Sequence, residues 1–331
     1  MAQEINFVDI WNEAMVGKER PIVERNYIYA SELGQDFSKR WCSMKGLTPT
    51  NPFDARTKRK FMAGEIFEDI IVDVFVKAGI FEKSQEDAKV EFFPAGETYL
   101  GVHGRPDAMT LEVKDWDALI KHAETSEDIE DGLRETTLNL LKYLKKSFPE
   151  GMPKAIFEIK TVHSDTFWKY LDQLKRGYHH HRMQLGAYLK HFGIDRGYII
   201  YVSKDDLAIE QATVLLSEIN QDIVDDVITM SGLLVKDVMP PAPPLIKWDD
   251  VKQKYAENWD ITRSTYRDYQ LNTTLEQGEA ACKFAELATR RLNDALKETA
   301  LLPREEVEQI VYKRSRYPIP TNKDGEQVRI V

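Results

Sequence analysis

The spacing of apolar side chains predicts a long helix followed by strands in the first half of the chain. Between residues 55 and 78 the apolar positions recur at roughly helical intervals: Phe61, Ile66, Ile70, Val74 and Phe75. Gly79 follows, where glycine commonly ends a helix. Residues 90–93 and 99–104 are strand-like and flank the turn residues 94–96, so they predict a β-hairpin. Residues 107–113 are expected to extend the same sheet.

The strongest strand pattern covers residues 155–162, which are rich in β-branched and apolar side chains. Residues 165–192 favour one long helix, and residues 197–202 favour another buried strand. This order of helix, strands, helix and strand predicts an α/β fold in which helices pack on a mixed central sheet.

The two ends of the chain show other patterns. Ser31 is predicted to cap a helix that carries Lys39 and Arg40. After residue 213 the chain is expected to be mainly helical, with an amphipathic helix over residues 275–301. The proline-rich residues 240–244 predict a stiff spacer.

These patterns divide the chain into three expected parts. They are an N-terminal helical segment at 1–54, an α/β core at 55–213 and a mainly helical C-terminal extension at 214–331. The basic, turn-rich residues 312–331 predict a strand pair or a tail at the end of the extension.

Charge changes this picture in one segment. The chain has 331 residues, 42% of them hydrophobic, which is typical of a folded protein, and a net charge of −10. That balance disfavours a protein that simply coats nucleic acid. Residues 115–135 contain eight acidic and two basic side chains, a net of −6. We therefore expect residues 115–150 to form a solvated helical insertion.

Composition also bounds the location and the cysteine chemistry. No run approaches the roughly 18 apolar residues that a membrane helix needs. The N-terminal residues lack the apolar region of a secretory signal, so we expect a cytoplasmic protein without a membrane partner. Cys42 and Cys282 cannot supply a four-thiolate site by themselves.

One strand carries charged residues at a spacing that suggests chemistry. Side chains two apart in a strand point to the same face, so Glu158 and Lys160 project together, while Ile159 points into the core. The backbone carbonyl of Ile159 is available as a further ligand. Asp107, at the start of a neighbouring strand, can complete a pair of carboxylates. Because buried charges are costly without a partner, this group predicts a site for Mg²⁺ or Mn²⁺.

Four motifs in this order resemble the RecB-type branch of the PD-(D/E)xK nucleases. They are Gly64-x-x-x-Glu68, Gly104-Arg105-Pro106-Asp107, Glu158-Ile159-Lys160 and Gln184-x-x-x-Tyr188. The resemblance covers about residues 55–205. It implies a restriction-endonuclease-like core, with the acidic helical insertion and the helical C-terminal extension added to it.

The resemblance also implies roles for these residues. Asp107 and Glu158 would hold the metal, with Glu68 as a third acidic group. Lys160 would position or activate the attacking water. Gln184 and Tyr188, at i and i+4 on one helical face, would lie beside the site.

Several alternatives stay open at this point. Glu112-Val113-Lys114 is a second Glu-x-Lys, but it runs directly into acidic, loop-like sequence, whereas the strand of Glu158 is apolar on both sides. Glu68 has an alternative in Glu65, or it is a solvated helix residue. Tyr188 alone fits an ordinary core position.

Candidate phosphate contacts come from basic side chains, each of which fits a solvated surface charge equally well. They are Arg59, Lys60, Arg105, Lys175, His181 and Arg182. Successive residues on a helix diverge by about 100°. The three histidines at 179–181 therefore cannot face one ion, and His181 is the one expected to approach phosphate.

The resemblance implies a metal-dependent deoxyribonuclease, and we expect an exonuclease of DNA recombination, repair or processing. DNA is the expected partner, with a protein partner or a second copy of the chain as further possibilities. Some members of this branch carry an iron–sulfur cluster, which we do not expect here because the cysteines are lacking. The alternative function is a non-cleaving DNA-binding or assembly module on the same fold. A third is a metal-dependent enzyme for another phosphate ester.

Overall fold

The computed structural model describes residues 11–12, 14, 22–77, 79–82, 88–90, 99–127, 129 and 131–298. Its contacts divide the chain into two compact units. The sheet unit combines Asn26–Gly34 with Arg56–Ser231, and the terminal unit combines Met1–Arg25, Gln35–Ala55 and Gly232–Val331. The three parts expected from the sequence stay predictions.

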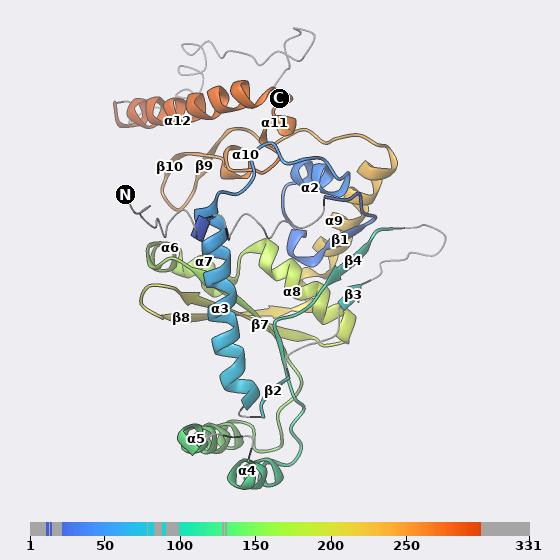
Figure 1. Cartoon of the computed structure of the whole chain (residues 1–331), viewed down its shortest axis with the longest axis vertical. Helices are drawn as coiled ribbons and strands as arrows, with labels where there is room; N and C mark the ends of the chain where they lie inside the picture. The colour runs from blue at the N-terminus through green and yellow to red at the C-terminus, as the bar shows by residue number, and fades with distance from the viewer. Residues whose placement is uncertain are drawn as a thin grey trace, which may run out of the picture. The chain divides into compact units, whose positions relative to one another are not determined.

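A five-stranded mixed sheet forms the centre of the sheet unit (Figure 1). Its order is β2 (Phe81–Glu82), β5 (Ala108–Thr110), β6 (Ile156–Val162), β7 (Arg196–Ser203) and β8 (Ile209–Leu215). The β6–β7 pair is parallel and the other pairs are antiparallel. The strands predicted at 155–162 and 197–202 are thereby confirmed.

Helices cover both faces of this sheet. Helix α3 (Ala55–Lys77) contributes Val72 to a core cluster with Ile159, on one face. Helix α8 (His179–Phe192) packs on the other face, where a side chain at Gly197 would lie 3.0 Å from Leu185. The predicted α/β class, a mixed sheet flanked by helices as in a restriction-endonuclease-like core, is confirmed.

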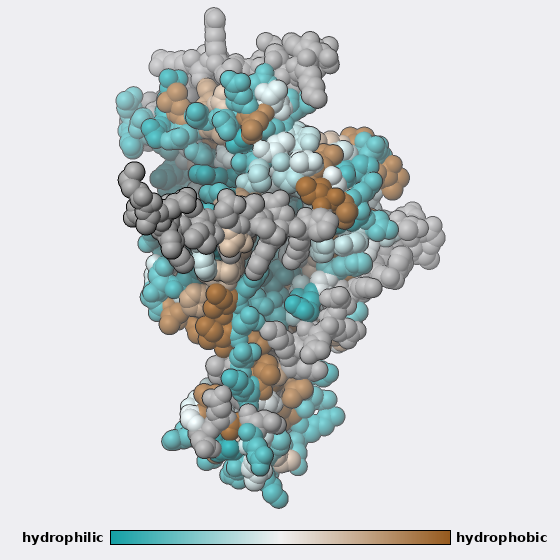
Figure 2. Space-filling view, in the orientation of Figure 1, coloured by the Kyte–Doolittle hydropathy of each residue, from teal (hydrophilic) through white to brown (hydrophobic). Residues whose placement is uncertain are grey.

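Helix α3 begins and ends where the sequence indicates. Gly79 adopts a positive φ of 68°, and its N–H donates to the carbonyl of Val76. Three of the apolar residues that predict this helix, however, lie on its outer side with half or more of their surface exposed: Phe61, Ile66 and Ile70. Figure 2 shows apolar side chains on the visible face over α3. Ile71, Val72 and Phe75 face the core instead.

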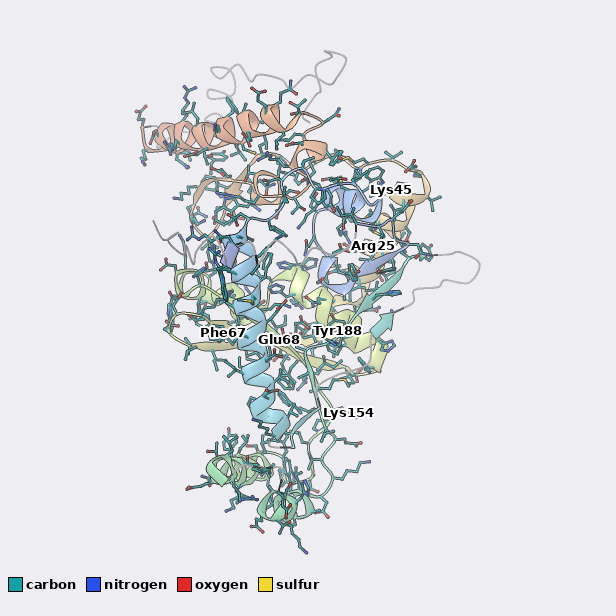
Figure 3. The ribbon with its side chains drawn as sticks, in the orientation of Figure 1. Arg25, Lys45, Phe67, Glu68, Lys154 and Tyr188 are labelled. Carbon is teal, nitrogen blue, oxygen red and sulfur yellow. The ribbon has the colours of Figure 1, made fainter. Side chains whose placement is uncertain are left out.

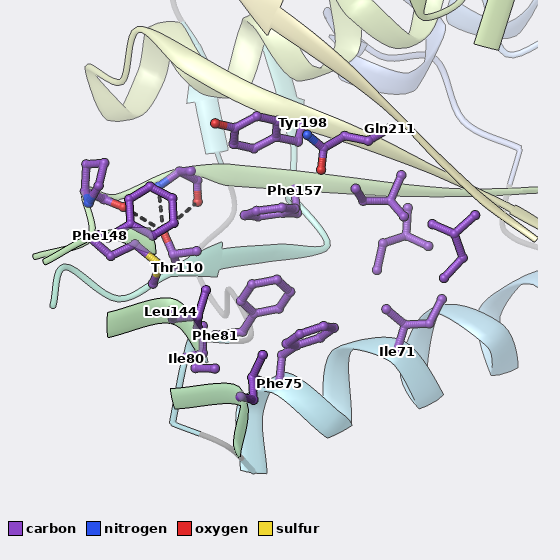
Figure 4. A pocket seen from close by; sticks show the side chains of 17 residues that line it. Ile71, Phe75, Ile80, Phe81, Thr110, Leu144, Phe148, Phe157, Tyr198 and Gln211 are labelled. Atoms are coloured by element: carbon purple, nitrogen blue, oxygen red, sulfur yellow. Dashed lines mark hydrogen bonds between the residues drawn. The ribbon is translucent and has the colours of Figure 1, made fainter. Parts of the chain in front are cut away.

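An apolar cavity of about 420 Å³ lies between α3, the insertion and the Ile159 face of the sheet (Figure 4). Phe75 on α3 and Phe157 and Tyr198 on neighbouring strands line it. Because side chains alternate along a strand, these aromatic rings lie on the face opposite to Glu158.

The predicted single helix over 165–192 is wrong, because the chain turns twice within it. It forms α6 (Ser164–Lys169), α7 (Leu171–Arg176) and α8. Gly177 ends α7 with φ 76° and ψ 134°, a conformation that other residues rarely adopt. Because α8 begins as a separate helix at His179, this break sets the direction in which α8 runs along the sheet.

A second sheet lies in the same unit, with the order β1 (Tyr27–Tyr29), β4 (Gly101–Gly104), β3 (Ala88–Val90). The antiparallel pairing of β3 with β4 agrees with the predicted pairing, although most of the predicted first strand and the turn, residues 91–98, lie outside the described residues. Strand β5 belongs to the other sheet, so the expectation that 107–113 extends the hairpin sheet is wrong. Pro106 stands between β4 and β5, and proline cannot donate to a strand ladder.

The acidic insertion is helical, as predicted. It contains α4 (Trp116–Thr125) and α5 (Asp131–Ser147). Its inner side is not solvated, because Trp116 and Leu141 are buried in the same core cluster as Ile159. The Trp116 indole also donates to the carbonyl of Phe148 at 2.7 Å. The segment is therefore part of the sheet unit's core. Acidic side chains of the described part of the segment, among them Asp117, Glu124 and Glu135, are exposed.

Helix α9 (Leu216–Val235) follows directly after β8. A side chain at Gly186 of α8 would lie 2.5 Å from Ile219 of α9, so the glycine allows the two helices to approach closely. Within the described residues, no helix has an apolar stretch long enough to cross a bilayer.

Helix α2 (Phe37–Met44), in the terminal unit, has a different cap from the predicted one. Ser31 lies in a short 3-10 helix, η1 (Ala30–Glu32), and Asp36 caps α2 by accepting from the N–H of Lys39 at 2.9 Å. A capping side chain accepts a hydrogen bond from the N–H two or three residues after it. Asp36 lies three residues before Lys39 and reaches its N–H, whereas Ser31 lies too far before it.

The rest of this unit is less helical than expected. A hairpin of β9 (Ile246–Asp249) and β10 (Lys254–Glu257) precedes α10 (Trp259–Thr262), α11 (Arg267–Gln270) and α12 (Leu275–Glu298). The hairpin was not predicted because each strand has only four residues. Helix α12 begins at the predicted residue, and the predicted tail at 312–331 lies outside the described residues.

Candidate active site

The pairing of β5 with β6 brings two carboxylates together. Ala108 lies opposite Phe157 and Met109 opposite Ile156. One step further along this antiparallel register, Asp107 lies opposite Glu158, and residues opposite each other share a face. The N–H of Ile159 also donates to Asp107 Oδ2 at 2.7 Å, which holds that carboxylate against β6.

Glu158 is fully buried. Its Oε1 accepts hydrogen bonds from Lys160 Nζ and, at 2.6 Å, from Gln184 Nε2. Its Oε2 has no hydrogen-bond partner among the described residues. A buried carboxylate oxygen without a partner is costly, and such atoms call for an explanation. Here the oxygen is free to accept a ligand.

The third acidic side chain comes from α3. The Glu68 carboxyl group hydrogen-bonds to Asp107, whereas Glu65 is exposed. Gly64 lies one turn before Glu68, and a side chain there would come within 3.2 Å of the Thr161 hydroxyl. The glycine lets α3 approach β6 closely enough for Glu68 to face the site (Figure 3). The geometry thus selects Glu68 over Glu65.

The charges of the three carboxylates and of Lys160 would not cancel. When all are ionised, three carboxylates and one ammonium group leave a net charge of −2. Burial raises the pKa of Glu158 to about 8 and that of Glu68 to about 7, and the neighbouring Asp107 adds to both. Burial also raises the pKa of Asp107. Because one ammonium group cannot neutralise three carboxylates, Glu158 and Glu68 stay partly protonated near pH 7, and full ionisation of the cluster calls for a further cation.

Lys160 stays cationic. Burial acts to lower the pKa of its amine, but the carboxylates of Glu158 and Asp107 outweigh burial and raise the pKa above its usual value. A lysine acts as a general base only when its pKa is strongly depressed. This environment therefore favours a charge-stabilising role for Lys160.

The donor set fits a hard divalent cation. As the side chains stand, no three His, Cys, Asp or Glu residues in the described ranges are arranged to hold a metal ion, because Glu158 Oε1 is turned to Lys160 and Gln184. The carboxyl groups and the unpartnered Oε2 nevertheless match the oxygen ligands that Mg²⁺ or Mn²⁺ binds. The metal stays a prediction, as does the Ile159 carbonyl as a ligand.

Gln184 and Tyr188 lie together on α8. Gln184 Nε2 is 3.3 Å from the Tyr188 hydroxyl and also donates to Glu158. Tyr188 is buried, and a side chain at Gly104 would lie 2.8 Å from its hydroxyl. Tyr188 therefore supports Gln184, which in turn orients Glu158.

The predicted phosphate contacts do not all gather at this cluster. Arg105 acts electrostatically on Asp107, and Lys160 acts on His181. Arg182 instead pairs with Glu218 at 2.9 Å. Lys175 is exposed near the end of α7, and Arg59 and Lys60 lie on α3. No contact joins these last three side chains to the carboxylates in the described part of the chain.

One residue beside Lys160 and another beside α3 were not predicted from the sequence. Tyr201 lies opposite Lys160 in the β6–β7 register. Lys204 donates to the carbonyl of Lys60 at 3.1 Å, beside the first half of α3. The period-two pattern of β7 places Tyr201 on one face with Ile199, but only the register assigns it to Lys160.

Comparison with known proteins adds little. No family model and no curated protein matches the chain. Among solved structures, the protein designated SSO0001 is 17% identical, with a TM-score of 0.40 over 69% of this chain and 87% of that one. An alkaline exonuclease (LHK-Exo) from Laribacter hongkongensis is 10% identical, with a TM-score of 0.30 over 69% and 95%. Such weak similarities assign no function. The site is defined by the register that joins Asp107 to Glu158.

Proposed function

We propose that this chain is a metal-dependent nuclease that hydrolyses phosphodiester bonds of DNA. The observation that supports it is the buried face of β5 and β6, where Asp107 lies opposite Glu158 with Lys160 beside them. The three carboxyl groups, once ionised, would hold a divalent cation, and this cation would also bind a phosphate. Exonuclease action in recombination, repair or DNA processing belongs to the proposal through the family resemblance alone.

The chain's carboxylates would hold the metal. Asp107, Glu158 and Glu68 supply oxygen donors, with the Ile159 carbonyl as a further one. Mg²⁺ or Mn²⁺, when bound there, polarises a phosphate and lowers the pKa of a bound water. Gln184 would orient the Glu158 carboxylate through the 2.6 Å hydrogen bond to Oε1, which leaves Oε2 as the oxygen donor.

Lys160 would stabilise the transition state. Its ammonium group lies on the same face as the carboxylates and stays charged. A phosphodiester gains negative charge on its oxygens during attack, and a fixed cation in a buried site stabilises that charge strongly.

Basic side chains farther away would hold the DNA backbone. The candidates are those predicted from the sequence: Arg59, Lys60, Arg105, Lys175, His181 and Arg182. Arg182 now pairs with Glu218 at the surface, and such exposed pairs contribute little free energy. A phosphate can therefore replace Glu218 as its partner.

The chain contains its own control for the central test. Lys160→Ala should lower Mg²⁺-dependent cleavage by at least about 100-fold, because a preorganised charge-stabilising group is lost. Lys114→Ala removes the lysine of the second Glu-x-Lys, an exposed ion pair with Glu112 at 3.4 Å, and should leave cleavage unchanged. Asp107→Ala should abolish cleavage.

The assay uses purified protein with end-labelled single- and double-stranded DNA, linear and circular, in Mg²⁺, Mn²⁺ or EDTA. Cleavage of linear but not circular DNA would identify an exonuclease. If Asp107→Ala and Lys160→Ala both cleave DNA like the wild type, the proposed function is wrong. If the folded wild type binds DNA without cleaving it, the non-cleaving alternative replaces it.

A further inference from the structure

A buried hydrogen-bond chain lies next to Lys160 at the start of α8. Tyr201, which is fully buried, lies opposite Lys160 in the parallel β6–β7 register. Its hydroxyl accepts a hydrogen bond from the backbone N–H of Tyr178 at 3.0 Å. The same hydroxyl is 2.9 Å from Nδ1 of His181. The Tyr178 N–H and the His181 ring thus meet at a single phenolic oxygen.

The hydrogen bonds at the Tyr201 hydroxyl determine which nitrogen of the His181 ring carries its hydrogen. A tyrosine hydroxyl has one hydrogen to donate and two lone pairs to accept with. The Tyr178 N–H occupies one lone pair. If His181 Nδ1 also donated, the buried hydroxyl hydrogen would lack an acceptor among these groups, which costs free energy. The favoured arrangement has Tyr201 donating to Nδ1, so the neutral His181 ring carries its own hydrogen on Nε2.

The surroundings of His181 keep its ring neutral. Burial lowers the pKa of His181 far below its usual value, and His180 and Lys160 lower it further. The His180 and His181 ring centres are only 4.1 Å apart, so a proton on either ring disfavours one on the other. A neutral ring with fixed hydrogens is a directed donor without charge.

The helix places this donor in line with the residues of the site. His181 precedes Gln184 by three positions and Tyr188 by seven, so all three share one face of α8. Gln184 contacts Glu158 from that face, and the Lys160 ammonium acts on His181. The break at Gly177 makes this possible, because it exposes the Tyr178 N–H to Tyr201.

We propose that Tyr201 is a positioning residue that holds His181 as an Nε2–H donor for a non-bridging oxygen of the phosphodiester beside Lys160. This inference rests on the proposed nuclease function and deepens it. Lys160 supplies charge to the substrate, and His181 supplies a neutral hydrogen bond of fixed direction. Tyr201 touches no substrate and acts only through His181.

Selective ¹⁵N labelling of histidine tests the hydrogen positions without DNA or metal. The His181 resonances are assigned by their loss in His181→Asn. We expect a pyridine-type shift for Nδ1 and a pyrrole-type shift for Nε2 in the wild type. Tyr201→Phe, which removes only the hydroxyl, should move both shifts toward those of a mixed tautomer population. A wild-type Nδ1–H form, or an unchanged spectrum in Tyr201→Phe, overturns the proposal.

Tyr198→Phe is the matched control. Tyr198 lies on the same strand but lines the apolar cavity on the opposite face, so removal of its hydroxyl should leave the His181 shifts and DNA cleavage unchanged. A His181 spectrum that changes equally in both variants would mean that Tyr201 has only a structural role, and this also overturns the proposal.

Kinetics then tests the role in cleavage. Tyr201→Phe should lower kcat about three- to tenfold, the effect of one net hydrogen bond. The double variant Tyr201→Phe with His181→Asn should cleave no more slowly than His181→Asn alone. Tyr201 acts only through the His181 donor, which both of these proteins lack. Additive losses overturn the proposal. A wild type that cleaves nothing ends the nuclease function and the phosphate role together, while the spectrum still reports the hydrogen positions.

Discussion

At the scale of single residues, Glu158 shows a conflict between stability and proposed function. A carboxylate buried among two others raises the free energy of the folded state, which is why burial moves its pKa to about 8. Oriented groups that are poorly satisfied in the free protein are typical of sites built to bind something. The unpartnered Oε2 of Glu158 belongs to the same pattern.

Glu158→Gln should stabilise the metal-free protein at high pH. The folded pKa of about 8 lies above the unfolded value of 4.5, so the folded state retains a proton that the unfolded state loses between these values. The wild type therefore loses stability as pH rises through this window, and the variant does not. Urea unfolding in EDTA should show a gain of more than about 1 kcal/mol at pH 8.5 and little gain at pH 4.5.

Glu112→Gln, at an exposed carboxylate, serves as the control for this measurement and should change stability equally little at both pH values. A Glu158→Gln protein that is less stable than the wild type at pH 8.5 would show that the carboxylate is not strained by its surroundings.

Gly104 is a second residue whose identity the site requires. A side chain there would lie 2.8 Å from both the Ala30 Cβ and the Tyr188 hydroxyl. Gly104→Ala should cost about 1–3 kcal/mol through overpacking and should lower cleavage by displacing Tyr188. Gly232→Ala, where nothing lies within 4 Å, should be neutral or slightly stabilising in thermal unfolding. Equal melting temperatures for the two variants would contradict the close approach at Gly104.

At the scale of elements, the break between α7 and α8 matters more than the length of either helix. Periodicity alone continues through residues 165–192, but Gly177 turns the chain, and α8 then runs with one face toward Glu158. Gln184, Tyr188 and His181 reach the site because of this turn. The i, i+4 spacing ensures only that they share a face.

Gly177→Ala should disturb this element more than Gly193→Ala does. Both glycines have positive φ, 76° and 65°, but only at Gly177 would a side chain meet neighbours, at 3.0 Å from Arg182 and 3.1 Å from Ile199. Backbone strain at either site costs about 1–3 kcal/mol. Denaturant unfolding should therefore show a larger loss of unfolding free energy for Gly177→Ala than for Gly193→Ala. The difference between the two losses measures the steric crowding at Gly177. A larger loss at Gly193 would contradict the described turn.

At the scale of the whole molecule, the net charge of −10 would repel the proposed anionic substrate. That count already includes the carboxylates of the buried cluster, each taken as ionised. A divalent cation would reduce the repulsion locally, which is consistent with a nuclease that engages DNA only when loaded. A protein that binds DNA through basic surface patches alone needs no divalent cation for binding.

Binding of Mg²⁺ or Mn²⁺ should release protons at pH 7. The pKa of Glu158 is about 8 and that of Glu68 about 7, so both carboxyl groups are partly protonated in the metal-free protein and must ionise to bind a cation. Titration calorimetry in two buffers of different ionisation enthalpy should give different apparent heats. Glu158→Gln should lose most of the binding heat. Identical heats in both buffers would contradict the raised pKa values.

Local pattern determined much of this protein. The period of two placed Glu158 and Lys160 on one strand face, the period of 3.6 placed Gln184 and Tyr188 together, and both follow from backbone geometry that needs no distant partner. The tertiary structure alone decided that Asp107 lies opposite Glu158, that Glu68 rather than Glu65 faces them, and that Tyr201 meets His181. These depend on strand register, helix approach and burial. Such features arise from contacts between residues far apart in the chain, and periodicity carries no information about them.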